Sequence, residues 1–531
     1  MTTDLMFPTQ LWPDEETIVL EDNGTNIFQP TFGGAVTQRT QGAEPKMVVK
    51  QTYRSLNADQ RIQLQSFVSQ TQGRFKSFWL SPSRYANVGS WAPTEVFTNN
   101  LFVNSTTGWI GNPATLSSIP GGLRLRNTKN AGKSDFSLYQ NIAISTIDIY
   151  ALRAFVKIPN FASTSSSQNG NFANCFYPVN KYVTGAYGMF DNIALASSGT
   201  SYVVYPWVTD AQGIATKAND YIDIQYASLA RALMIDGKQN MLIYSEAINS
   251  GWASLSVTNS INTAIDPTGS TLGDSMLETN TVGANAHGYY QNVAVDSGIL
   301  DVTMSASFKQ GLHATKARVY LENPVGFDSA YTDVEFSTGS TTLGSVGTSW
   351  THIRTCVCSE GNGWWRAGIS ARKVSSSASV NAFMMLSNTA GAFNYAGTGS
   401  GYIYVYGPSF SKSPVPIGYT STSTAAYVGA SPTSDLISVK GGPLGVLGAI
   451  KEGQIVEIGG ELKTIVSDVD FDACGRGTLK IRPSLFRSPA IDSAVHVTRP
   501  FGRFVLRNAP EVINKLGRYI DVTLEMEEVY E

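Results

Sequence analysis

The sequence predicts a mainly β protein in which two similar β-sandwich modules are inserted into one split end domain that contains a single helix. Three observations lead to this fold class. Only 15% of the 531 residues are charged, whereas 49 glycines, 24 tyrosines and 24 phenylalanines favour sheets joined by tight turns. The middle of the chain repeats one pattern of strands. The two ends differ from that middle, and neither is long enough to bury a comfortable core alone.

The repeat is clearest where LYQNIAIS (138–145) is followed later by YYQNVAVD (289–296). Three further matches flank this pair in the same order, and they join 99–109 with 239–252, 150–157 with 302–309, and 221–229 with 402–410. Ordered matches of this kind indicate a duplicated module. We therefore predict a first sandwich at 93–236 and a second at 237–415, joined around 232–239.

We predict a β-β-α-β unit for the first end segment, 1–92. Strands are expected within 29–40 and 46–56, and again at 74–82. Asn57 is a good N-cap for the helix between them, and Gln60 three residues later completes a capping box. The side chains that share one apolar face of this helix are Leu64, Phe67, Val68 and Thr71.

The second end segment, 436–531, predicts short strands alternating with turns. A stretch rich in Ser, Thr and Pro precedes it, and we interpret 416–435 as an extended linker. The simplest arrangement folds 1–92 and 436–531 together, with both modules inserted in a loop between them. Such insertions cost little when the loop ends lie close together in the parent fold.

Bulk properties exclude several classes of function. A net charge of −3 leaves no electrostatic footprint for nucleic acid. No basic segment followed by an apolar core begins the chain, so a signal peptide is not expected. No stretch approaches the ~18 apolar residues of a spanning helix, so membrane insertion is not expected. Cys356 and Cys358 lie two apart on a predicted strand, and we interpret them as buried thiols of a protein made in a reducing compartment.

Both ends resemble distal tail proteins of long-tailed bacteriophages. The resemblance lies in FQPTFGGAVTQRT through GRFKSFWL (28–80) and in EGQIVEIGG through RPFGRFVLRN (452–508). It implies a ring, usually a hexamer, that joins the tail tube to the tip. The implied partners are the tail tube protein and the baseplate hub or tape-measure proteins. The implied location is the virion tail tip, after assembly in the bacterial cytoplasm.

The middle is similar to lectin-like jelly-roll β-sandwiches, the carbohydrate-binding modules carried by phage proteins. This similarity lies in NMLIYSEAINSGW (240–252), GNGWWRAGIS (361–370) and GYIYVYGPSF (401–410). It implies adhesion to a host cell-surface glycan. Two alternatives stay open: a tail-borne polysaccharide depolymerase, and a purely architectural decoration that binds no sugar.

Flat aromatic rings beside polar side chains are the expected sugar contacts. Adjacent strand residues point to opposite faces, so Trp364 and Trp365 cannot both be exposed. We predict sugar contacts at Trp365, Arg366, Tyr289 and Tyr404, with core packing as the alternative for each. The polar helix face could cover the sheet or contact a neighbouring subunit, and the residues predicted for that oligomer interface are Arg61, Gln65 and Gln70.

No catalytic residues are predicted, because the acids do not repeat between the modules. In the matched blocks Asp223 falls opposite Tyr404, and Asp296 falls opposite Ser145. DVDFD (468–472) lacks the glycine and glutamate of an EF-hand loop, so it is interpreted as a polar strand and turn. No cofactor or metal site is predicted, although a structural calcium in the sandwich modules stays open.

Overall fold

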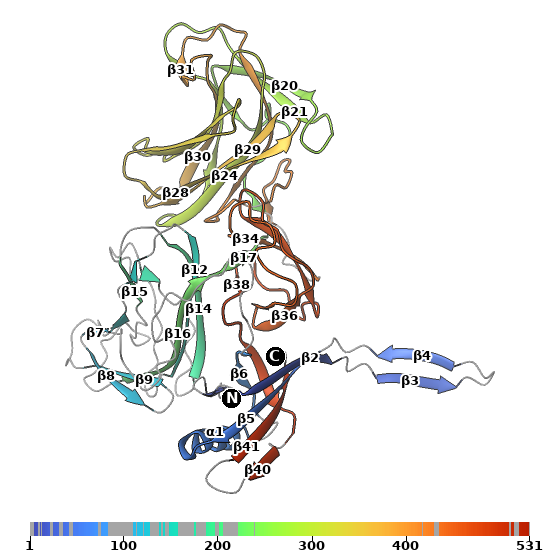
Figure 1. The fold of residues 1–531 in the computed structure, drawn as a ribbon. Coiled ribbons are helices and arrows are strands. Elements are labelled where there is room, and N and C mark those ends of the chain that lie inside the picture. Colours follow the sequence, from blue (N-terminus) through green and yellow to red (C-terminus); the bar gives the residue numbers. More distant parts are fainter. Residues whose placement is uncertain are drawn as a thin grey trace.

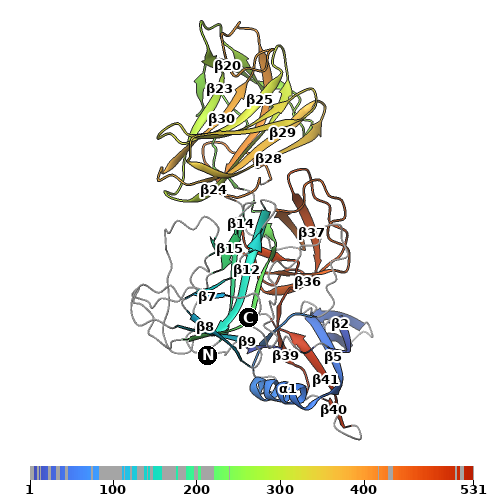
Figure 2. The same ribbon diagram turned by 60° about the vertical axis from the view of Figure 1, so that its left-hand side comes forward.

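A computed structural model of the chain describes residues 5–8, 11, 13–21, 25–30, 36–41, 46–72, 76–82, 110–112, 114–119, 122–127, 137–139, 142–143, 148–157, 175–176, 187–196, 201–204, 221–237, 239–416, 418–428, 435–508, 511–514 and 520–529. Figure 1 shows the second sandwich at the top, a small barrel beneath it, and the end domain with the helix α1 at the bottom. The sheet of the first module lies beside the barrel in this view and in Figure 2.

The end domain is one sheet built from both ends of the chain. Its strand order is β1-β6-β39-β41-β5-β2, with β40 paired to β41. The bounds are β1 (Leu5–Met6), β2 (Glu15–Glu21), β5 (Lys46–Leu56), β6 (Phe78–Leu80), β39 (Gly502–Leu506), β40 (Glu511–Asn514) and β41 (Ile520–Glu528). Because β41 pairs along nearly the whole of β5, the two ends share one core. Both ends of the chain therefore contribute strands to this sheet.

Helix α1 (Ala58–Thr71) covers this sheet and begins with the predicted capping box. Asn57 Oδ1 accepts the N–H of Gln60 at 2.9 Å, and Gln60 Oε1 accepts the N–H of Asn57 at 3.1 Å. Leu64, Phe67 and Thr71 are buried, as their spacing predicts. A separate hairpin of β3 (Thr25–Pro30) and β4 (Val36–Gln41) projects from this domain as an arm (Figure 1).

The first module contains a five-stranded antiparallel sheet of order β14-β12-β16-β9-β8. Its strands are β8 (Ala114–Ile119), β9 (Gly122–Asn127), β12 (Asp148–Lys157), β14 (Tyr187–Ala196) and β16 (Tyr221–Arg231). Two smaller sheets, β10-β7 and β11-β15-β13, accompany it. These strands are β7 (Ile110–Asn112), β10 (Ser137–Tyr139), β11 (Ile142–Ala143), β13 (Cys175–Phe176) and β15 (Ser201–Val204).

The second module is a sandwich of two six-stranded sheets around a single apolar core. The β24 sheet has the order β20-β21-β32-β24-β29-β28, and the β30 sheet has the order β19-β23-β30-β25-β26-β27. The β24-sheet strands are β20 (Val257–Ala264), β21 (Gly273–Glu278), β24 (Leu300–Gln310), β28 (Trp350–Gly361), β29 (Trp364–Lys373) and β32 (Tyr402–Ser411). The β30-sheet strands are β19 (Ala253–Leu255), β23 (Gly288–Ala294), β25 (Lys316–Glu322), β26 (Ser329–Glu335), β27 (Thr341–Val346) and β30 (Ser379–Leu386). The short pair β22 (Asn285–Ala286) and β31 (Asn394–Tyr395) closes one end.

Strand pairing confirms that the two modules are copies. The order β8-β9-β16-β12-β14 in the first matches β20-β21-β32-β24-β29 in the second. Lys157 pairs with Asp223 in the first copy, and Lys309 pairs with Tyr404 in the second. These four residues occupy equivalent places in the matched sequence blocks 150–157/302–309 and 221–229/402–410. The duplication therefore extends from the sequence to the register of individual pairs.

A closed six-stranded barrel separates the second sandwich from the end domain, and the sequence did not predict it. Its order is β17-β34-β37-β36-β35-β38. The strands are β17 (Leu233–Ile235), β34 (Leu436–Lys440), β35 (Ile455–Ile458), β36 (Glu461–Ile465), β37 (Arg476–Arg482) and β38 (Ala494–His496). The joint predicted at 232–239 is thus a barrel strand, and only the last part of 436–531 joins the end-domain sheet. The chain forms the second sandwich between β17 and β34, so this module is inserted in the barrel. The barrel is a separate unit, because it buries its own apolar core.

The predicted linker 416–435 is folded against the second sandwich over residues 418–428. The N–H groups of Tyr244 and Ser245 donate to the carbonyls of Ser423 and Thr422. Strand β33 (Tyr427–Val428) pairs with β18 (Gln239–Asn240). These backbone hydrogen bonds hold a segment whose Ser, Thr and Pro content suggests a free chain, so its interpretation as an extended linker is corrected here.

Candidate functional site

Two of the four predicted sugar contacts are inside the second sandwich. Tyr289 is 4% exposed and belongs to the core, where burial, helped by the charge of Asp274, raises its pKa to about 12. Arg366 is 3% exposed, and its guanidinium donates to Ser307 Oγ, Ser305 Oγ and a backbone carbonyl. The segment after β32 covers this part of the β24 sheet, with Tyr419 beside Arg366. Neither residue can contact a sugar from outside, which corrects the prediction.

The other two predicted contacts are half-buried. Trp365 packs at the margin of the core, and its Nε1 donates to the carbonyl of Phe336 at 3.2 Å. Trp364 on the opposite face is fully buried and donates to Ile265. Tyr404 lies on the outer face of the β24 sheet, where the hydrogen bond to Tyr402 and burial raise its pKa.

A row of four aromatic residues crosses the outer face of the β30 sheet. Tyr290, Phe383, Tyr320 and Tyr331 are register partners on the consecutive strands β23, β30, β25 and β26. The row, called the aromatic row below, spans three strand spacings, or about 14 Å. The next partner is Gly344 on β27, where an added Cβ would lie 2.3 Å from the ring of Tyr331. Glycine there lets the ring of Tyr331 lie over the edge strand.

The rings of the aromatic row support one another. Tyr290 and Phe383 are stacked with centroids 4.7 Å apart, and Phe383 meets Tyr320 edge to face at 5.1 Å. Tyr320 and Tyr331 are stacked at 6.4 Å. The three tyrosines are half-exposed while Phe383 is 7% exposed. The row is therefore a pre-formed apolar platform, because each ring is positioned before any ligand arrives.

A row of polar side chains lies next to the aromatic row on the same face. Asn292, Asn381 and Glu322 are register partners on β23, β30 and β25. Asn292 Nδ2 donates to Asn381 Oδ1 at 2.7 Å, and Asn381 Nδ2 donates to Glu322 Oε1 at 3.0 Å. The hydroxyl of Tyr320 donates to Glu322 Oε2 at 3.2 Å. This polar row offers fixed amide and carboxylate groups beside the rings, as hydroxyl-rich ligands require.

The opposite border of the aromatic row is an ion pair held between rings. Arg318 donates two hydrogen bonds to Asp333, at 2.6 and 3.0 Å. Its guanidinium carbon lies 3.9 Å from the ring centroid of Tyr331 and 4.0 Å from that of Phe393. Stacking of this kind keeps the charge paired and the side chain fixed.

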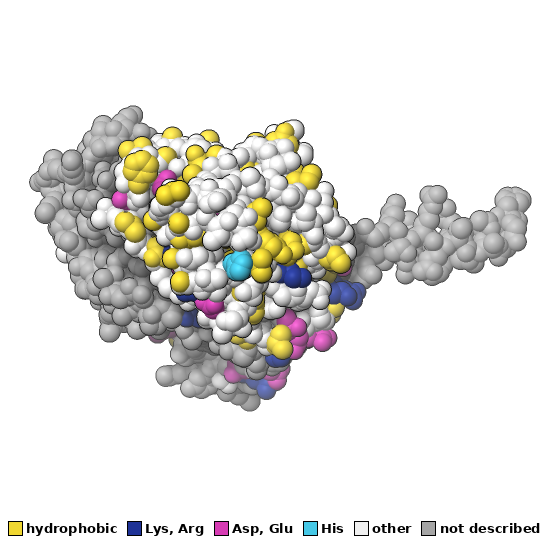
Figure 3. Space-filling model, turned by 90° about the horizontal axis from the view of Figure 1, so that it is seen from above, with side chains coloured by type: hydrophobic (Ala, Val, Ile, Leu, Met, Phe, Trp, Pro, Cys, Tyr) yellow, Lys and Arg dark blue, Asp and Glu magenta, His cyan; other side chains and the backbone are white. Residues whose placement is uncertain are grey.

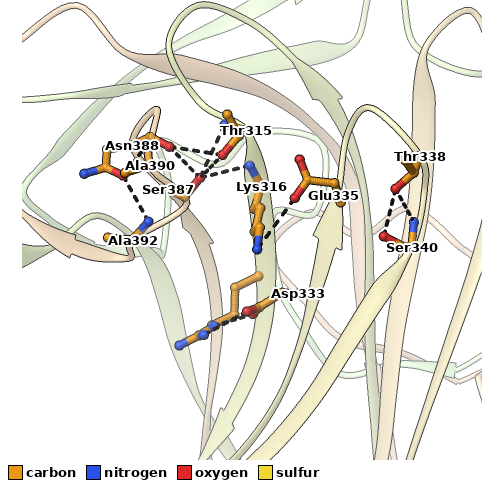
Figure 4. Close-up of polar contacts among 11 residues, drawn as sticks. Thr315, Lys316, Asp333, Glu335, Thr338, Ser340, Ser387, Asn388, Ala390 and Ala392 are labelled. Carbon is orange, nitrogen blue, oxygen red and sulfur yellow. Dashed lines mark hydrogen bonds and ion pairs between the residues drawn. The ribbon is translucent and has the colours of Figure 1, made fainter.

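The loop that carries Phe393 is itself fixed by polar contacts (Figure 4). Asn388 Oδ1 accepts the N–H groups of Ala390 and Ala392, at 2.9 and 3.0 Å. Ser387 Oγ accepts the N–H of Lys316 at 2.9 Å, which ties the start of the loop to β25. The border of the face is therefore preorganised as well as its floor.

Several carboxylates of the second sandwich hold loops. Glu278 accepts hydrogen bonds from Thr398 and Gly401; although burial alone would raise its pKa, these bonds lower it to about 2. Asp274, Asp266 and Asp328 each accept two backbone N–H groups. A glycosidase needs two carboxyl groups free to face a cleft, and these four are engaged with their own backbone.

The aspartates of DVDFD also accept hydrogen bonds from the protein. Asp468 pairs with Lys451, Asp470 accepts the N–H of Gly448, and Asp472 accepts those of Cys474 and Arg476. The segment thus forms turns of the barrel, as its interpretation as a strand and turn predicts. Among the described residues, no group of three or more His, Cys, Asp or Glu side chains is arranged to hold a metal ion.

The surface around the far end of the second sandwich is largely uncharged (Figure 3). Hydrophobic side chains are scattered among polar atoms there and do not form one large patch. Such a surface offers no concentrated charge to attract a polyanion. No helix in the described part of the chain is long and apolar enough to span a membrane.

The four residues of the aromatic row were not among the sugar contacts predicted from the sequence. Tyr320, Tyr331 and Phe383 alternate with buried residues along β25, β26 and β30, so period-two alternation could have placed them on an outer face. Alternation cannot show that they align, because register depends on which strands pair. The predicted interface residues Arg61, Gln65 and Gln70 are all exposed on α1, which leaves that prediction open.

Comparison with known proteins yields structural similarity only. No protein-family model matches the sequence, and no curated protein matches it. The structure of TmCBM61 in complex with beta-1,4-galactotriose aligns over 28% of this chain and 98% of its own, with 10% identity and a TM-score of 0.15. A structure of carbohydrate-binding modules of the β-sandwich superfamily with promiscuous specificity aligns over 53% and 98%, with 11% identity and a TM-score of 0.14. At these TM-scores the similarity says nothing about a ligand of this chain.

Proposed function

We propose that this protein is a structural component of a phage tail tip and binds a host-surface glycan across the outer face of its β30 sheet. The observation that carries glycan binding is the aromatic row, aligned in register and flanked by the polar row of Asn292, Asn381 and Glu322. Pyranose rings can lie on such rings while their hydroxyls bond the adjacent amides and carboxylate. The face can bind a glycan without rearranging, because its side chains already hold one another in position through ring contacts and hydrogen bonds.

The face favours a neutral glycan. Glu322 brings a negative charge to the polar row, and Arg318 is already paired with Asp333. An acidic polysaccharide would place like charges together, which is unfavourable in a partly desolvated site. Neutral hexose polymers are therefore the expected ligands.

The tail-tip role rests on the end domain. Its two halves come from opposite ends of the chain, as in the family they resemble, and α1 presents Arg61, Gln65 and Gln70 to solvent. A ring, usually a hexamer in that family, would repeat the glycan-binding face around one axis. Repetition converts weak single contacts into firm adhesion. The tail tube and the hub or tape-measure proteins are the proposed partners, in a virion assembled in the bacterial cytoplasm.

Glycan binding is tested by affinity electrophoresis of the full chain in gels that contain neutral or acidic host polysaccharides. We expect retardation by a neutral polymer and its loss in Tyr320→Ala. Phe327→Ala is the matched control, because Phe327 is 71% exposed outside the aromatic row. Equal retardation of the Tyr320 and Phe327 variants would reject the face as the binding site.

The tail role is tested by electron microscopy of the purified chain and of virions labelled against it. A ring at the tail tip is expected, and a monomer at high concentration would reject it. The depolymerase alternative predicts released oligosaccharides when polysaccharide is incubated with the protein. The architectural alternative predicts unchanged phage adsorption for the Tyr320→Ala variant.

A further inference from the structure

Three cysteines meet where the second sandwich contacts the barrel. Cys356 and Cys358 lie on β28, and Cys474 lies in the turn before β37. The sulfurs of Cys474 and Cys356 are 2.6 Å apart, and Cys474 also hydrogen-bonds Cys358. A disulfide bond measures about 2.05 Å, so a shift of about half an ångström would join the first pair.

The surroundings hold these thiols in place. Cys356 faces Gly368 on β29, where an added Cβ would lie 2.9 Å from its sulfur. Asp472 Oδ1 accepts the N–H groups of Cys474 and Arg476, which fixes the turn that presents Cys474. Cys356 and Cys474 are buried, whereas Cys358 is half-buried. Cys358 is therefore the least buried cysteine of the cluster.

We propose that this cluster is an oxidation site that bonds the second sandwich to the barrel through a Cys356–Cys474 disulfide, with Cys358 as the entry thiol. The two bonded cysteines belong to different folding units that otherwise meet without a covalent link at this point. Their bond would close a loop across 118 positions of the chain. It would fix the direction in which the second sandwich faces.

The reaction requires an oxidant such as oxidised glutathione. The Cys358 thiolate attacks one glutathione sulfur, which forms a mixed disulfide and releases one reduced glutathione. Cys474 then attacks the Cys358 sulfur and expels the second glutathione, and exchange with Cys356 returns Cys358 to the thiol. In total two thiols lose two protons and two electrons, and one oxidised glutathione becomes two reduced molecules.

The reduced cluster is slow to react. The hydrogen bond to Cys474 and burial raise the pKa of the Cys358 thiol. The contact with Cys356 raises the pKa of the Cys474 thiol. A protonated thiol is a poor nucleophile, so the cluster stays reduced in a reducing compartment. Oxidation then requires an oxidising environment.

The test treats the full, folded chain with oxidised glutathione, blocks the remaining thiols, and maps disulfides in a non-reducing digest by mass spectrometry. We expect one joined peptide pair, Cys356 with Cys474, and Cys358 recovered as a blocked thiol. In Cys358→Ser the same pair should form several-fold more slowly. In Cys474→Ser no pair should form, and glutathione should remain on Cys358.

Several outcomes would overturn the proposal. They are the absence of a joined pair in the wild-type chain, a stable pair that contains Cys358, and an unchanged rate in Cys358→Ser. Circular dichroism of each variant shows whether it folds, and Cys474→Ala replaces Cys474→Ser if the serine is not tolerated. Cys175 is mapped in the same digest, so that a link to it is recognised.

Discussion

Arg153 and Glu457 form a buried two-point ion pair that joins the first module to the barrel. Nη1 of Arg153 lies 2.7 Å from Oε2 of Glu457, and Nη2 lies 2.6 Å from Oε1. The same carboxylate accepts the N–H of Phe501, which leads into the end-domain sheet. The ring of Phe501 packs on Tyr226 of the first module. Three folding units thus meet at one carboxylate.

Removal of the arginine should strongly destabilise this junction. Arg153→Ala leaves Glu457 buried without its countercharge, and we expect a loss of about 3–5 kcal/mol in the free energy of unfolding. Urea denaturation measures this loss. Arg54→Ala is the matched control, because Arg54 pairs with Glu15 at the surface and such pairs contribute about 0–1 kcal/mol. Equal losses in both variants would contradict a special role for the junction.

We expect the ring of Tyr320 to contribute more to glycan affinity than its hydroxyl group does. Tyr320→Phe should keep most of the affinity, whereas Tyr320→Ala should lose about 1 kcal/mol or more, roughly a five-fold increase in Kd. Isothermal titration with the neutral glycan identified by electrophoresis measures both. If Tyr320→Phe loses as much as Tyr320→Ala, the hydroxyl and its bond to Glu322 are what matter.

We expect the capping box at Asn57 to stabilise the first turn of α1. Asn57→Ala removes the acceptor for the N–H of Gln60 and should cost about 1 kcal/mol of end-domain stability. Chemical denaturation followed by circular dichroism reports the change. Ser69→Ala, exposed on the same helix, should change stability by less than half of that. No difference between the two variants would mean that the sheet alone holds the helix.

We expect Glu278 to make the stability of the second sandwich sensitive to acid. Its pKa is lowered from 4.5 to about 2 in the folded chain, so its ionised form stabilises the fold above pH 4.5. That stabilisation should disappear as the pH falls from about 4.5 towards 2. Thermal unfolding across this range should therefore show a steeper decline for the wild-type chain than for Glu278→Gln. Asp296→Asn, at a mostly exposed carboxylate, should follow the wild-type curve.

Several features could be predicted from sequence because they are local or repeated. The helix at 58–71 follows from its cap and its spacing, and it begins directly after the predicted N-cap Asn57. The duplicated modules follow from matched blocks, and the pairs Lys157–Asp223 and Lys309–Tyr404 confirm the match. The union of the two ends follows from the shortness of each.

Other features were missed because they depend on partners far away in the chain. The barrel needs β17 to pair with β34 and β38 across the whole second sandwich, and three residues carry no signal of that. The exposure of Arg366 was misjudged because the segment that covers it comes from the supposed linker. Tyr289 was misjudged because its side chain faces the core between the two sheets, and alternation does not show which face of a strand is the inner one. Burial is set by what lies above a strand, and alternation reports only which side a residue faces.

A mainly β chain, its duplicated middle, its capped helix and the union of its ends could all be inferred without a structure. These features depend on composition, local hydrogen bonding and internal repetition, which can all be recognised in a single amino-acid sequence. The aromatic row, the barrel and the contact of Cys356 with Cys474 became visible only in the folded chain. Each of these depends on strand register or on contacts between distant segments, and both are settled only when the whole chain packs.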